Sequence, residues 1–374
     1  MKILFVLSDV GFFLSHRLRL AVVAQASGHE VVLAVPRTAE TAELEIYNFH
    51  ICRYELKRKS KNPVSETRSF LSLYGLMKSQ RPDVAHLITA KPIFYGGVAA
   101  RILGIPVLAA LTGLGYIFTH ETLKTRFLRA VAAPIFRLAL NHRRCHALFQ
   151  NREDQELLRK AGFIKKATTS LIGGSGVDLD EITPAALPGG LPVVMLPARM
   201  LWDKGVREFV EAADLLRRDG VEAKFCLRGD PDPNNPTSVT VDQLKHWDAQ
   251  GNVSWRPHTS DINGALAACH IVVLPSYREG FPKTLIDAAA AGRVAVASDV
   301  PGCRDAIVVG KTGYLCAARD AHSLAQQLAR LINSPARVAE MGAAARVHAE
   351  AHFDIRAVCT AHIKLYADLA ARNK

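Results

Sequence analysis

The sequence predicts an α/β protein built from two doubly wound, Rossmann-like domains that face a cleft. Three observations lead to this expectation: the length of 374 residues, the alternation of short apolar runs with longer helical patterns, and a segment rich in proline and glycine near the middle of the chain. A chain of this length exceeds the size at which a single hydrophobic core stops growing. Hydrophobic residues make up 49% of the composition, which is enough to fill two cores.

Ten short apolar or β-branched runs are expected to form strands, because turn residues and amphipathic segments separate each run from the next. Five lie in the first half, at residues 2–7, 31–35, 84–89, 107–111 and 147–150, and five in the second, at 193–197, 223–227, 253–255, 271–274 and 294–297. Strands that alternate with helices form parallel sheets. Ligands of such sheets bind at the carboxyl ends of the strands.

The domain boundary is expected at residues 184–192, which read Pro-Ala-Ala-Leu-Pro-Gly-Gly-Leu-Pro, a linker composition. We therefore expect a first domain over residues 1–185 and a second over residues 186–350. Residues 351–374 are expected to form a C-terminal helix that is a candidate to cross back to the first domain.

Membrane and disulfide signals are weak in this sequence. The longest apolar stretch, residues 92–118, is interrupted by Arg101, prolines and glycines, so a buried helix followed by a strand is expected rather than a membrane span. The N-terminus reads as a first strand and not as a signal peptide. The seven cysteines are scattered and form no CxxC, which fits a reducing cytosol better than a disulfide framework or a zinc site.

The positive charge is concentrated in the first half of the chain. Residues 1–183 hold 25 Lys and Arg against 15 Asp and Glu, and residues 184–374 hold 22 against 20. Such asymmetry indicates an anionic partner, whether nucleic acid, anionic lipid or a phosphorylated substrate. Residues 124–144 predict a basic amphipathic helix, which either packs on the core or attaches to a membrane surface. Residues 57–61 predict a basic loop, which either faces the same membrane surface or is solvated.

The segment after the strand at 271–274 carries the clearest chemistry. A loop leads into a helix that begins near Pro282, and the unpaired N–H groups of a helix N-terminus attract phosphate oxygens. Of Glu279 in the loop and Asp287 in the helix, one suits the hydroxyls of a sugar and the other suits those of a ribose. The alternatives are a solvated loop carboxylate and a charge on the helix surface.

Residues 279–293 and the following Asp-Val-Pro-Gly-Cys-Arg-Asp at 299–305 resemble glycosyltransferase family 4. The resemblance implies a GT-B fold, sugar transfer with retention of configuration, and a donor site formed by Gly280, Phe281, Lys283, Thr284, Leu285 and Asp287, with Glu279 as a catalytic-site residue that orients the sugar. The family motif is Glu, seven residues, then Glu, and this chain ends it with Asp287.

The same resemblance assigns two cations to the donor diphosphate. Residues 197–205 match the family's pattern after the first strand of the second domain. The resemblance therefore assigns to Arg199 and Lys204 the roles of the family's diphosphate-binding Arg and Lys. Both can stabilise the charge of a departing nucleoside diphosphate. The alternative is a pair of surface cations that flank a helix start.

The N-terminal segment 9–17 and the Gly-Asp-Pro-Asp-Pro-Asn-Asn-Pro run at 229–236 are similar to a family 4 subgroup that extends polyprenyl-diphosphate-linked sugars. Gly11 is a donor-binding candidate, because glycine permits close backbone approach to the donor phosphate or to the acceptor, although a tight turn alone also uses glycine. His16 and Thr112 are acceptor-site candidates, and Thr112 stands where many family members have a histidine. His86, inside a predicted strand, is more typical of a hydrogen-bonded structural histidine than of a proton carrier.

No cofactor and no metal are expected. The Asp-x-Asp pairs at 178–180 and 230–232 have the spacing of a divalent-cation site but follow no convincing buried strand. We therefore expect a cytoplasmic enzyme, peripheral on the inner face of the membrane, that transfers a hexose or N-acetylhexosamine from a UDP-sugar to a polyprenyl-diphosphate-linked saccharide. The alternatives are a UDP-sugar 2-epimerase of the same fold and, more distantly, a basic nucleic-acid-binding protein, which lacks a recognisable binding motif.

Overall fold

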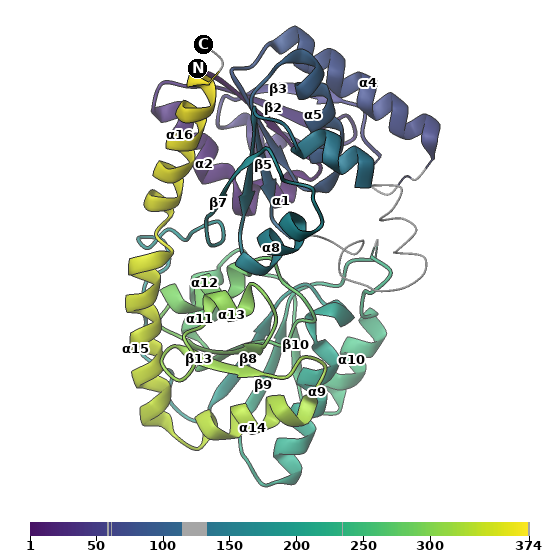
Figure 1. The fold of residues 1–374 in the computed structure, drawn as a ribbon. Coiled ribbons are helices and arrows are strands. Elements are labelled where there is room, and N and C mark those ends of the chain that lie inside the picture. The colour runs from purple at the N-terminus through teal and green to yellow at the C-terminus, as the bar shows by residue number, and fades with distance from the viewer. Residues whose placement is uncertain (58–59, 61, 114–132, 234, 373–374) are drawn as a thin grey trace. The chain divides into compact units, whose positions relative to one another are not determined.

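The computed structural model describes the chain except for residues 58–59, 61, 114–132, 234 and 373–374 (Figure 1). The described residues divide into two compact units. Unit 1 contains Met1–Ser175 and Arg356–Lys374, and unit 2 contains Gly176–Ile355.

Unit 1 is built on a seven-stranded parallel sheet in the order β3-β2-β1-β4-β5-β6-β7. Its strands are β1 (Lys2–Val6), β2 (Glu30–Pro36), β3 (His50–Tyr54), β4 (Val84–Ile88), β5 (Val107–Leu111), β6 (Cys145–Phe149) and β7 (Thr168–Leu171). Its helices are α1 (Val10–His16), α2 (Leu18–Ala26), α3 (Ala42–Glu45), α4 (Pro63–Gln80), α5 (Ala90–Leu103), residues 133–140, α8 (Arg152–Lys160) and α16 (Ile355–Ala371). The strand order reverses direction between β1 and β4, which makes their carboxyl ends the expected ligand position of this sheet.

Unit 2 repeats the plan with a six-stranded parallel sheet in the order β10-β9-β8-β11-β12-β13. Its strands are β8 (Val193–Pro197), β9 (Lys224–Arg228), β10 (Ser254–Arg256), β11 (Ile271–Leu274), β12 (Val294–Ser298) and β13 (Gly313–Cys316). Its helical segments are the short 3-10 turn η1 (Trp202–Lys204), α9 (Val206–Arg218), α10 (Val241–Ala249), α11 (Ile262–Ala267), α12 (Lys283–Ala290), α13 (Cys303–Ala306), α14 (Ala321–Ile332) and α15 (Pro335–His352). Here the order reverses between β8 and β11.

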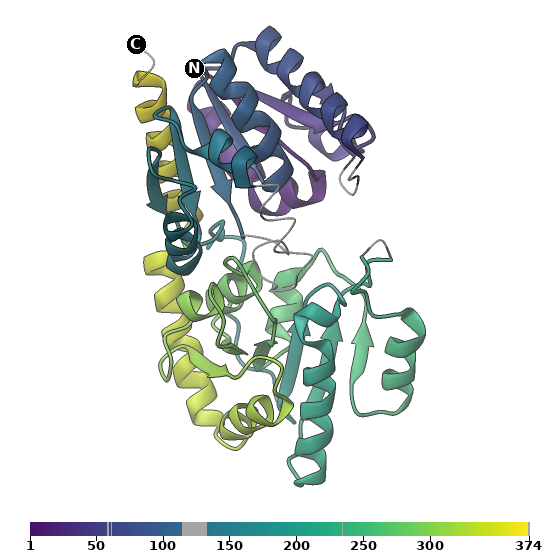
Figure 2. The same cartoon turned by 45° about the vertical axis from the view of Figure 1, so that its right-hand side comes forward.

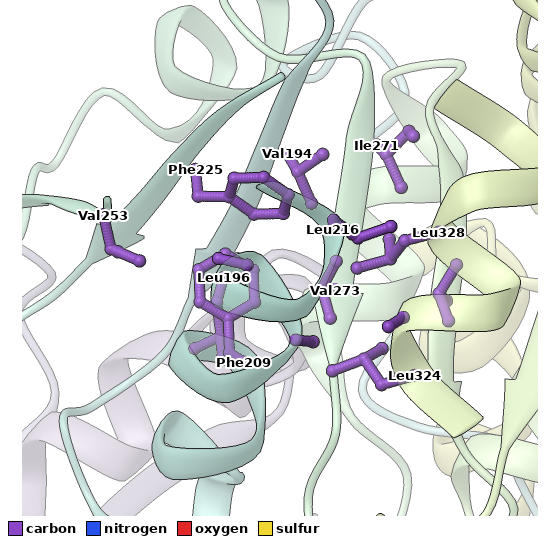
Figure 3. Packing of buried hydrophobic residues seen from close by; sticks show 14 of the residues in the cluster. Val194, Leu196, Phe209, Leu216, Phe225, Val253, Ile271, Val273, Leu324 and Leu328 are labelled. Carbon is purple, nitrogen blue, oxygen red and sulfur yellow. The ribbon is translucent and has the colours of Figure 1, made fainter. Parts of the chain in front are cut away.

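Side chains from strands and helices interlock in the core of unit 2 (Figure 3). Leu196 and Val273 from the sheet meet Phe209 of α9 and Leu324 of α14, and all four are fully buried. The central strands carry apolar residues at successive positions because helices cover both faces of a parallel sheet.

All ten predicted strands are confirmed, to within two residues at each end. Three strands were missed: β3, β7 and β13. The first two are edge strands with exposed polar residues in them, so they lack the continuous apolar run that marks a central strand. The third, β13, is only four residues long and begins with Gly313.

The apolar stretch 92–118 forms the buried helix α5 and the strand β5 over its described part, as expected. Among the described residues, no helix combines the length and the hydropathy needed to cross a bilayer. Of the predicted amphipathic helix at 124–144, the structure describes the part from residue 133, which is helical to residue 140. Ile135 and Leu138 are about half exposed there, whereas Phe136 between them is buried.

Helix α16 docks on unit 1 through buried polar side chains (Figures 1 and 2, yellow). Tyr366 lies 2.6 Å from Nδ1 of His86 on β4, and Nδ1 of His362 contacts the carbonyl of Val358 at 2.8 Å. Arg17, at the junction of α1 and α2, is also buried and donates to the carbonyl of His16. His86 is thus structural, as expected, but only partly hydrogen-bonded, because its Nε2 and that of His362 have no protein partner.

Burial and the nearby Arg17 guanidinium lower the pKa of both histidines, that of His362 to about 3. The unfolded chain therefore takes up protons below about pH 6.5 while the folded chain does not, so stability falls as the pH falls from about 6.5 toward 3. We expect a loss of about 1.4 kcal/mol per histidine per pH unit in this window. Thermal unfolding midpoints across this range measure it.

The variant His362→Leu removes one of these titrations and should make the decline with pH shallower. The matched control is His322→Leu on the exposed face of α14. Its unfolding midpoint should fall with pH as that of the wild type does. If the unfolding midpoint changed with pH at the same rate in all three proteins, a role for the buried histidine would be contradicted.

Two loops of unit 2 touch backbone to backbone at the carboxyl edge of the sheet. Gly205, which ends η1 with φ +74°, lies so close to the β11 loop that a Cβ there would sit 2.1 Å from the carbonyl oxygen of Pro275. The amide of Tyr277 in that loop donates to the carbonyl of Asp203 at 2.9 Å. Only glycine permits both the backbone conformation and the contact.

Gly205→Ala should lower the free energy of unfolding by about 2–4 kcal/mol, because it adds a steric clash to the strain of a left-handed residue. The control is Gly251→Ala, where φ is +76° but no atom lies within 4 Å of the added Cβ. This control variant should lower the free energy of unfolding by only about 1–2 kcal/mol. Urea unfolding of both variants measures the difference, and equal losses would show that the contact with Pro275 does not matter.

Candidate functional site

Four loops meet at the carboxyl edge of the unit 2 sheet, because its strands are parallel. They follow β8, β9, β11 and β12 and contain residues 198–205, 229–240, 275–282 and 299–302 respectively. The β8 and β11 loops flank the point where the strand order reverses. This is the position at which doubly wound sheets bind their ligands.

Lys204 and Glu279 form an ion pair at that point. The Nζ of Lys204 lies 2.5 Å from Oε1 of Glu279, and the two side chains are 25% and 12% exposed. The two residues are 75 positions apart in sequence, and the contact between Gly205 and Pro275 brings their loops together. The tertiary structure thus joins two residues that sequence reasoning named separately.

Tyr277 links the β11 loop to α9 and was missed by sequence reasoning. Its hydroxyl donates to Oε1 of Glu208 at 2.8 Å, and the guanidinium of Arg319 lies 4.3 Å from its ring centre. Burial and the Glu208 carboxylate raise the pKa of Tyr277 to about 12, so the phenol stays protonated. The only signal in the sequence was its place in the loop directly after a buried strand.

Helix α12 begins shortly after Glu279 and has no side-chain cap. Its N-cap is Pro282, which makes no side-chain hydrogen bond, and its first turn contains no acidic residue. Thr284 in this turn donates its hydroxyl to the carbonyl of Pro197 at the end of β8, at 3.2 Å. The helix N-terminus therefore carries a partial positive charge at the same edge as Lys204.

The other residues of this segment contribute in different ways. Phe281 and Leu285 bury their side chains in the core, and Phe281 packs against Phe353 at 5.6 Å between ring centres. Any ligand contact at these two positions must come from the backbone. Gly280 is held by the β12 loop, since a Cβ on Gly302 would lie 2.3 Å from the Gly280 carbonyl oxygen.

Asp287 is buried and already has a partner. Its Oδ1 lies 2.5 Å from the Nζ of Lys283, one helical turn earlier in α12. Burial raises the pKa of the Asp287 carboxyl, and Lys283 opposes this rise. Within this unit, Asp287 and Lys283 neutralise each other rather than extending into solvent.

Arg199 points toward the β9 loop instead of the Lys204–Glu279 pair. Its Nη1 lies 3.2 Å from Oδ2 of Asp232, and its side chain is 59% exposed. The β8 and β9 loops are in close backbone contact, because a Cβ on Gly229 would lie 2.0 Å from the carbonyl oxygen of Ala198. Arg199 is therefore largely exposed and is paired with a carboxylate of the β9 loop.

The two Asp-x-Asp pairs have other contacts in the structure. Asp230 accepts a hydrogen bond from the amide of His258, Asp232 pairs with Arg199, and Asp178 accepts from the amide of Asp180. Among the described residues, no group of three or more His, Cys, Asp or Glu side chains is arranged to hold a metal ion.

The three remaining candidates lie in unit 1. Gly11 is exposed in α1 with an ordinary helical conformation, and a Cβ there would only touch Asp9 at 3.4 Å, so the tight-turn explanation for this glycine is wrong. His16 stacks on Phe12 at 4.2 Å and contacts the Ser15 hydroxyl at 2.6 Å. Thr112 follows β5 and is partly buried.

Comparisons with known proteins agree with this architecture. Residues 2–151 match the model of the glycosyl transferase 4-like family, and residues 191–334 match that of the glycosyl transferases group 1. The chain is 30% identical over 317 residues to the N,N'-diacetylbacillosaminyl-diphospho-undecaprenol alpha-1,3-N-acetylgalactosaminyltransferase of Campylobacter jejuni, covering 81% of this chain and 82% of that protein. It is 26% identical to a UDP-Gal:alpha-D-GlcNAc-diphosphoundecaprenol alpha-1,3-galactosyltransferase of Escherichia coli, over 72% of this chain and 71% of that protein.

Solved structures share the fold at low sequence identity. Anabaena HepE, solved in complex with UDP and glucose, matches with a TM-score of 0.79 and 17% identity over 98% of this chain and 99% of that one. A glycosyltransferase from Rickettsia africae matches with a TM-score of 0.78 and 19% identity over 98% of both chains. These matches show the GT-B fold. The transferase relatives do not favour the epimerase alternative. The chain belongs to glycosyltransferase family 4 and is a hexosyltransferase.

Proposed function

We propose that this enzyme transfers a hexose or N-acetylhexosamine from a UDP-sugar to a polyprenyl-diphosphate-linked saccharide, with retention of configuration. The observation that carries the proposal is the Lys204–Glu279 pair beside the uncapped N-terminus of α12. The lipid-linked acceptors of the Campylobacter jejuni and Escherichia coli relatives support the acceptor class. The UDP bound in the Anabaena structure supports the nucleotide.

Unit 2 would hold the donor. An incoming diphosphate is attracted by Lys204, by the amides at the start of α12 and by Arg199 once it leaves Asp232. Glu279 does not repel the diphosphate, because Lys204 balances its charge. As Lys204 turns to the phosphates, the Glu279 oxygens are released to accept hydrogen bonds from the sugar hydroxyls.

The chemistry then depends on stabilising the leaving group. The acceptor hydroxyl attacks the anomeric carbon from the face that the diphosphate leaves, and the departing phosphate oxygen takes the hydroxyl proton. Negative charge grows on that oxygen, and fixed cations close to it lower the barrier. Lys204, Arg199 and the α12 amides supply the positive charge that a divalent cation supplies in other transferases, so we propose that the reaction needs no metal.

Unit 1 would bind the acceptor at the carboxyl edge of its sheet. Gly11, His16 and Thr112 belong to segments that follow β1 and β5 at that edge. The excess of basic residues in the first half of the chain would hold the enzyme on the anionic inner face of the membrane, where the diphosphate of a polyprenyl acceptor lies.

Incubation with UDP- and GDP-sugars plus a membrane lipid extract tests the reaction. We expect a UDP-sugar to be consumed, label to enter the lipid phase, and EDTA to have no effect. Lys204→Met should lower kcat/KM about 100-fold, because it removes a cation from the leaving group. Lys224→Met, at an exposed lysine of β9, is the matched control and should leave the rate unchanged.

The outcomes separate the parts of the proposal. If every donor is left intact, the transferase assignment to these substrates is wrong. If Glu279→Ala transfers sugar at the wild-type rate, only the assignment of Glu279 is wrong. Loss of activity in EDTA that added magnesium restores would contradict metal-independent transfer alone.

Membrane attachment has its own test. The protein should sediment with vesicles that contain phosphatidylglycerol at about 50 mM salt and be released at about 500 mM, because salt screens the attraction between exposed charges. Salt-insensitive binding to vesicles of phosphatidylcholine alone would count against an electrostatic attachment.

A further inference from the structure

We propose that Tyr277 and Glu208 are positioning residues that hold Lys204 where the donor diphosphate binds. Neither of the two side chains contacts the donor, and each acts through the segment that carries Lys204 or Glu279. The proposal rests on the proposed function, because it assigns a role to the hydrogen bond that joins the two loops of the proposed donor site.

The hydrogen bond between Tyr277 and Glu208 spans the same two segments as the ion pair. Tyr277 lies two positions before Glu279 in the β11 loop, and Glu208 lies four positions after Lys204, in the first turn of α9. The phenol donates to Oε1 of Glu208 at 2.8 Å, and the ion pair joins Lys204 to Glu279 at 2.5 Å. Both contacts therefore connect the β11 loop to the segment that runs from η1 into α9.

Tyr277 is fixed through its backbone, its hydroxyl and its ring. Its amide donates to the carbonyl of Asp203 at 2.9 Å, its hydroxyl donates to Glu208, and the guanidinium of Arg319 lies 4.3 Å from its ring centre. Arg319 has a φ of +62°, a backbone conformation that L-amino acids rarely adopt. A strained residue persists only where its surroundings hold it, and such residues are concentrated at functional sites. The ring of Tyr277 thus stacks on a residue whose own position is closely determined.

Stability alone does not explain the Glu208 carboxylate. Glu208 is 6% exposed, and its Oε2 has no hydrogen-bond partner among the described residues. A buried carboxylate with one unsatisfied oxygen lowers stability, and a pair of apolar side chains of the same shape would be nearly neutral or better. A hydrogen bond, however, fixes both the distance and the direction between two side chains. The contact therefore favours a role in the geometry of the two loops.

The phenol of Tyr277 remains a hydrogen-bond donor at neutral and mildly alkaline pH. Burial, together with the Glu208 carboxylate, raises the pKa of Tyr277 to about 12. The phenol therefore keeps its proton, and the bond between the two loops does not depend on pH in this range.

This bond matters most when the donor is bound. In the proposed function Lys204 turns from Glu279 to the phosphates, so the ion pair no longer joins the two loops. The bond between Tyr277 and Glu208 remains, because neither partner binds the donor, and it keeps Lys204 close to the diphosphate. A displacement of about 1 Å at a group that acts on the reacting atoms can lower a rate about 100-fold.

A double-mutant cycle tests whether Tyr277 acts through Lys204. The measured quantity is the Kd of UDP by titration calorimetry, because UDP binding needs no acceptor. Tyr277→Phe should weaken UDP binding about tenfold in the wild-type background, since the hydrogen bond to Glu208 is lost. In the Lys204→Met background the same substitution should change the Kd less than about twofold, because the residue that it positions is absent.

Conservative and matched variants separate positioning from a general loss of stability. Glu208→Gln keeps an oxygen that accepts the hydrogen bond of the phenol, so its Kd should stay within about threefold of the wild type. Glu208→Ala should weaken UDP binding about tenfold. The control is Tyr314→Phe, at a buried tyrosine of β13 whose hydroxyl accepts from Arg337 at 2.9 Å, and it should leave the Kd unchanged. Thermal unfolding midpoints close to that of the wild type confirm that each variant is folded.

Equal losses of affinity from Tyr277→Phe in the two backgrounds would overturn the proposal, since they would show that Tyr277 does not act through Lys204. So would wild-type UDP binding by both Tyr277→Phe and Glu208→Ala. If Lys204→Met binds UDP as the wild type does, the proposed donor site is wrong and this proposal falls with it. If the wild type binds UDP but transfers no sugar to a lipid-linked acceptor, the proposed reaction is wrong, and the cycle of UDP affinities still decides the positioning role.

Discussion

The contact between Gly205 and Pro275 is the constraint on which the candidate donor site depends. It lets the loops after β8 and β11 meet without an intervening side chain, at the point where the strand order of unit 2 reverses. Lys204 and Glu279 are neighbours only because of this approach. Doubly wound sheets bind their ligands at the carboxyl ends of the strands where the strand order reverses. In this enzyme a balanced ion pair lies at that point, and the N-terminus of α12 follows in the same loop.

Charge balance is the second organising feature of the site. Glu279 pairs with Lys204, Asp287 with Lys283, and Asp232 with Arg199. In the donor site proposed above, each pair would keep a carboxylate from repelling the diphosphate and would hold a cation near it. The most exposed of these pairs, that of Arg199, contributes little to stability and is the easiest to break. The pair in α12 is costlier to separate, because the Asp287 carboxylate is buried and would be left as an unpaired charge without Lys283.

Unit 1 combines a rigid interior with a basic exterior. Helix α16 returns to it from the end of the chain and buries His362 and Tyr366 against His86 and Arg17, a polar cluster that fixes the register of the helix. On the outside, Lys91 donates hydrogen bonds to Glu66 and to two loop carbonyls. Because Lys91 balances the charge of Glu66, the exposed face of α4 is basic and partly apolar. The buried polar cluster thus anchors the C-terminal helix on the sheet of unit 1.

The sequence by itself determined the two parallel sheets, because central strands buried on both faces leave continuous apolar runs such as 107–111 and 271–274. It also named Glu279, Arg199 and Lys204 through the motifs that surround them. It missed β3 and β7, whose half-exposed edges carry polar residues, and Tyr277, whose partner Glu208 is distant in sequence. Only the tertiary structure decided which cation meets which carboxylate, because loop packing sets distances between side chains and no local pattern encodes them.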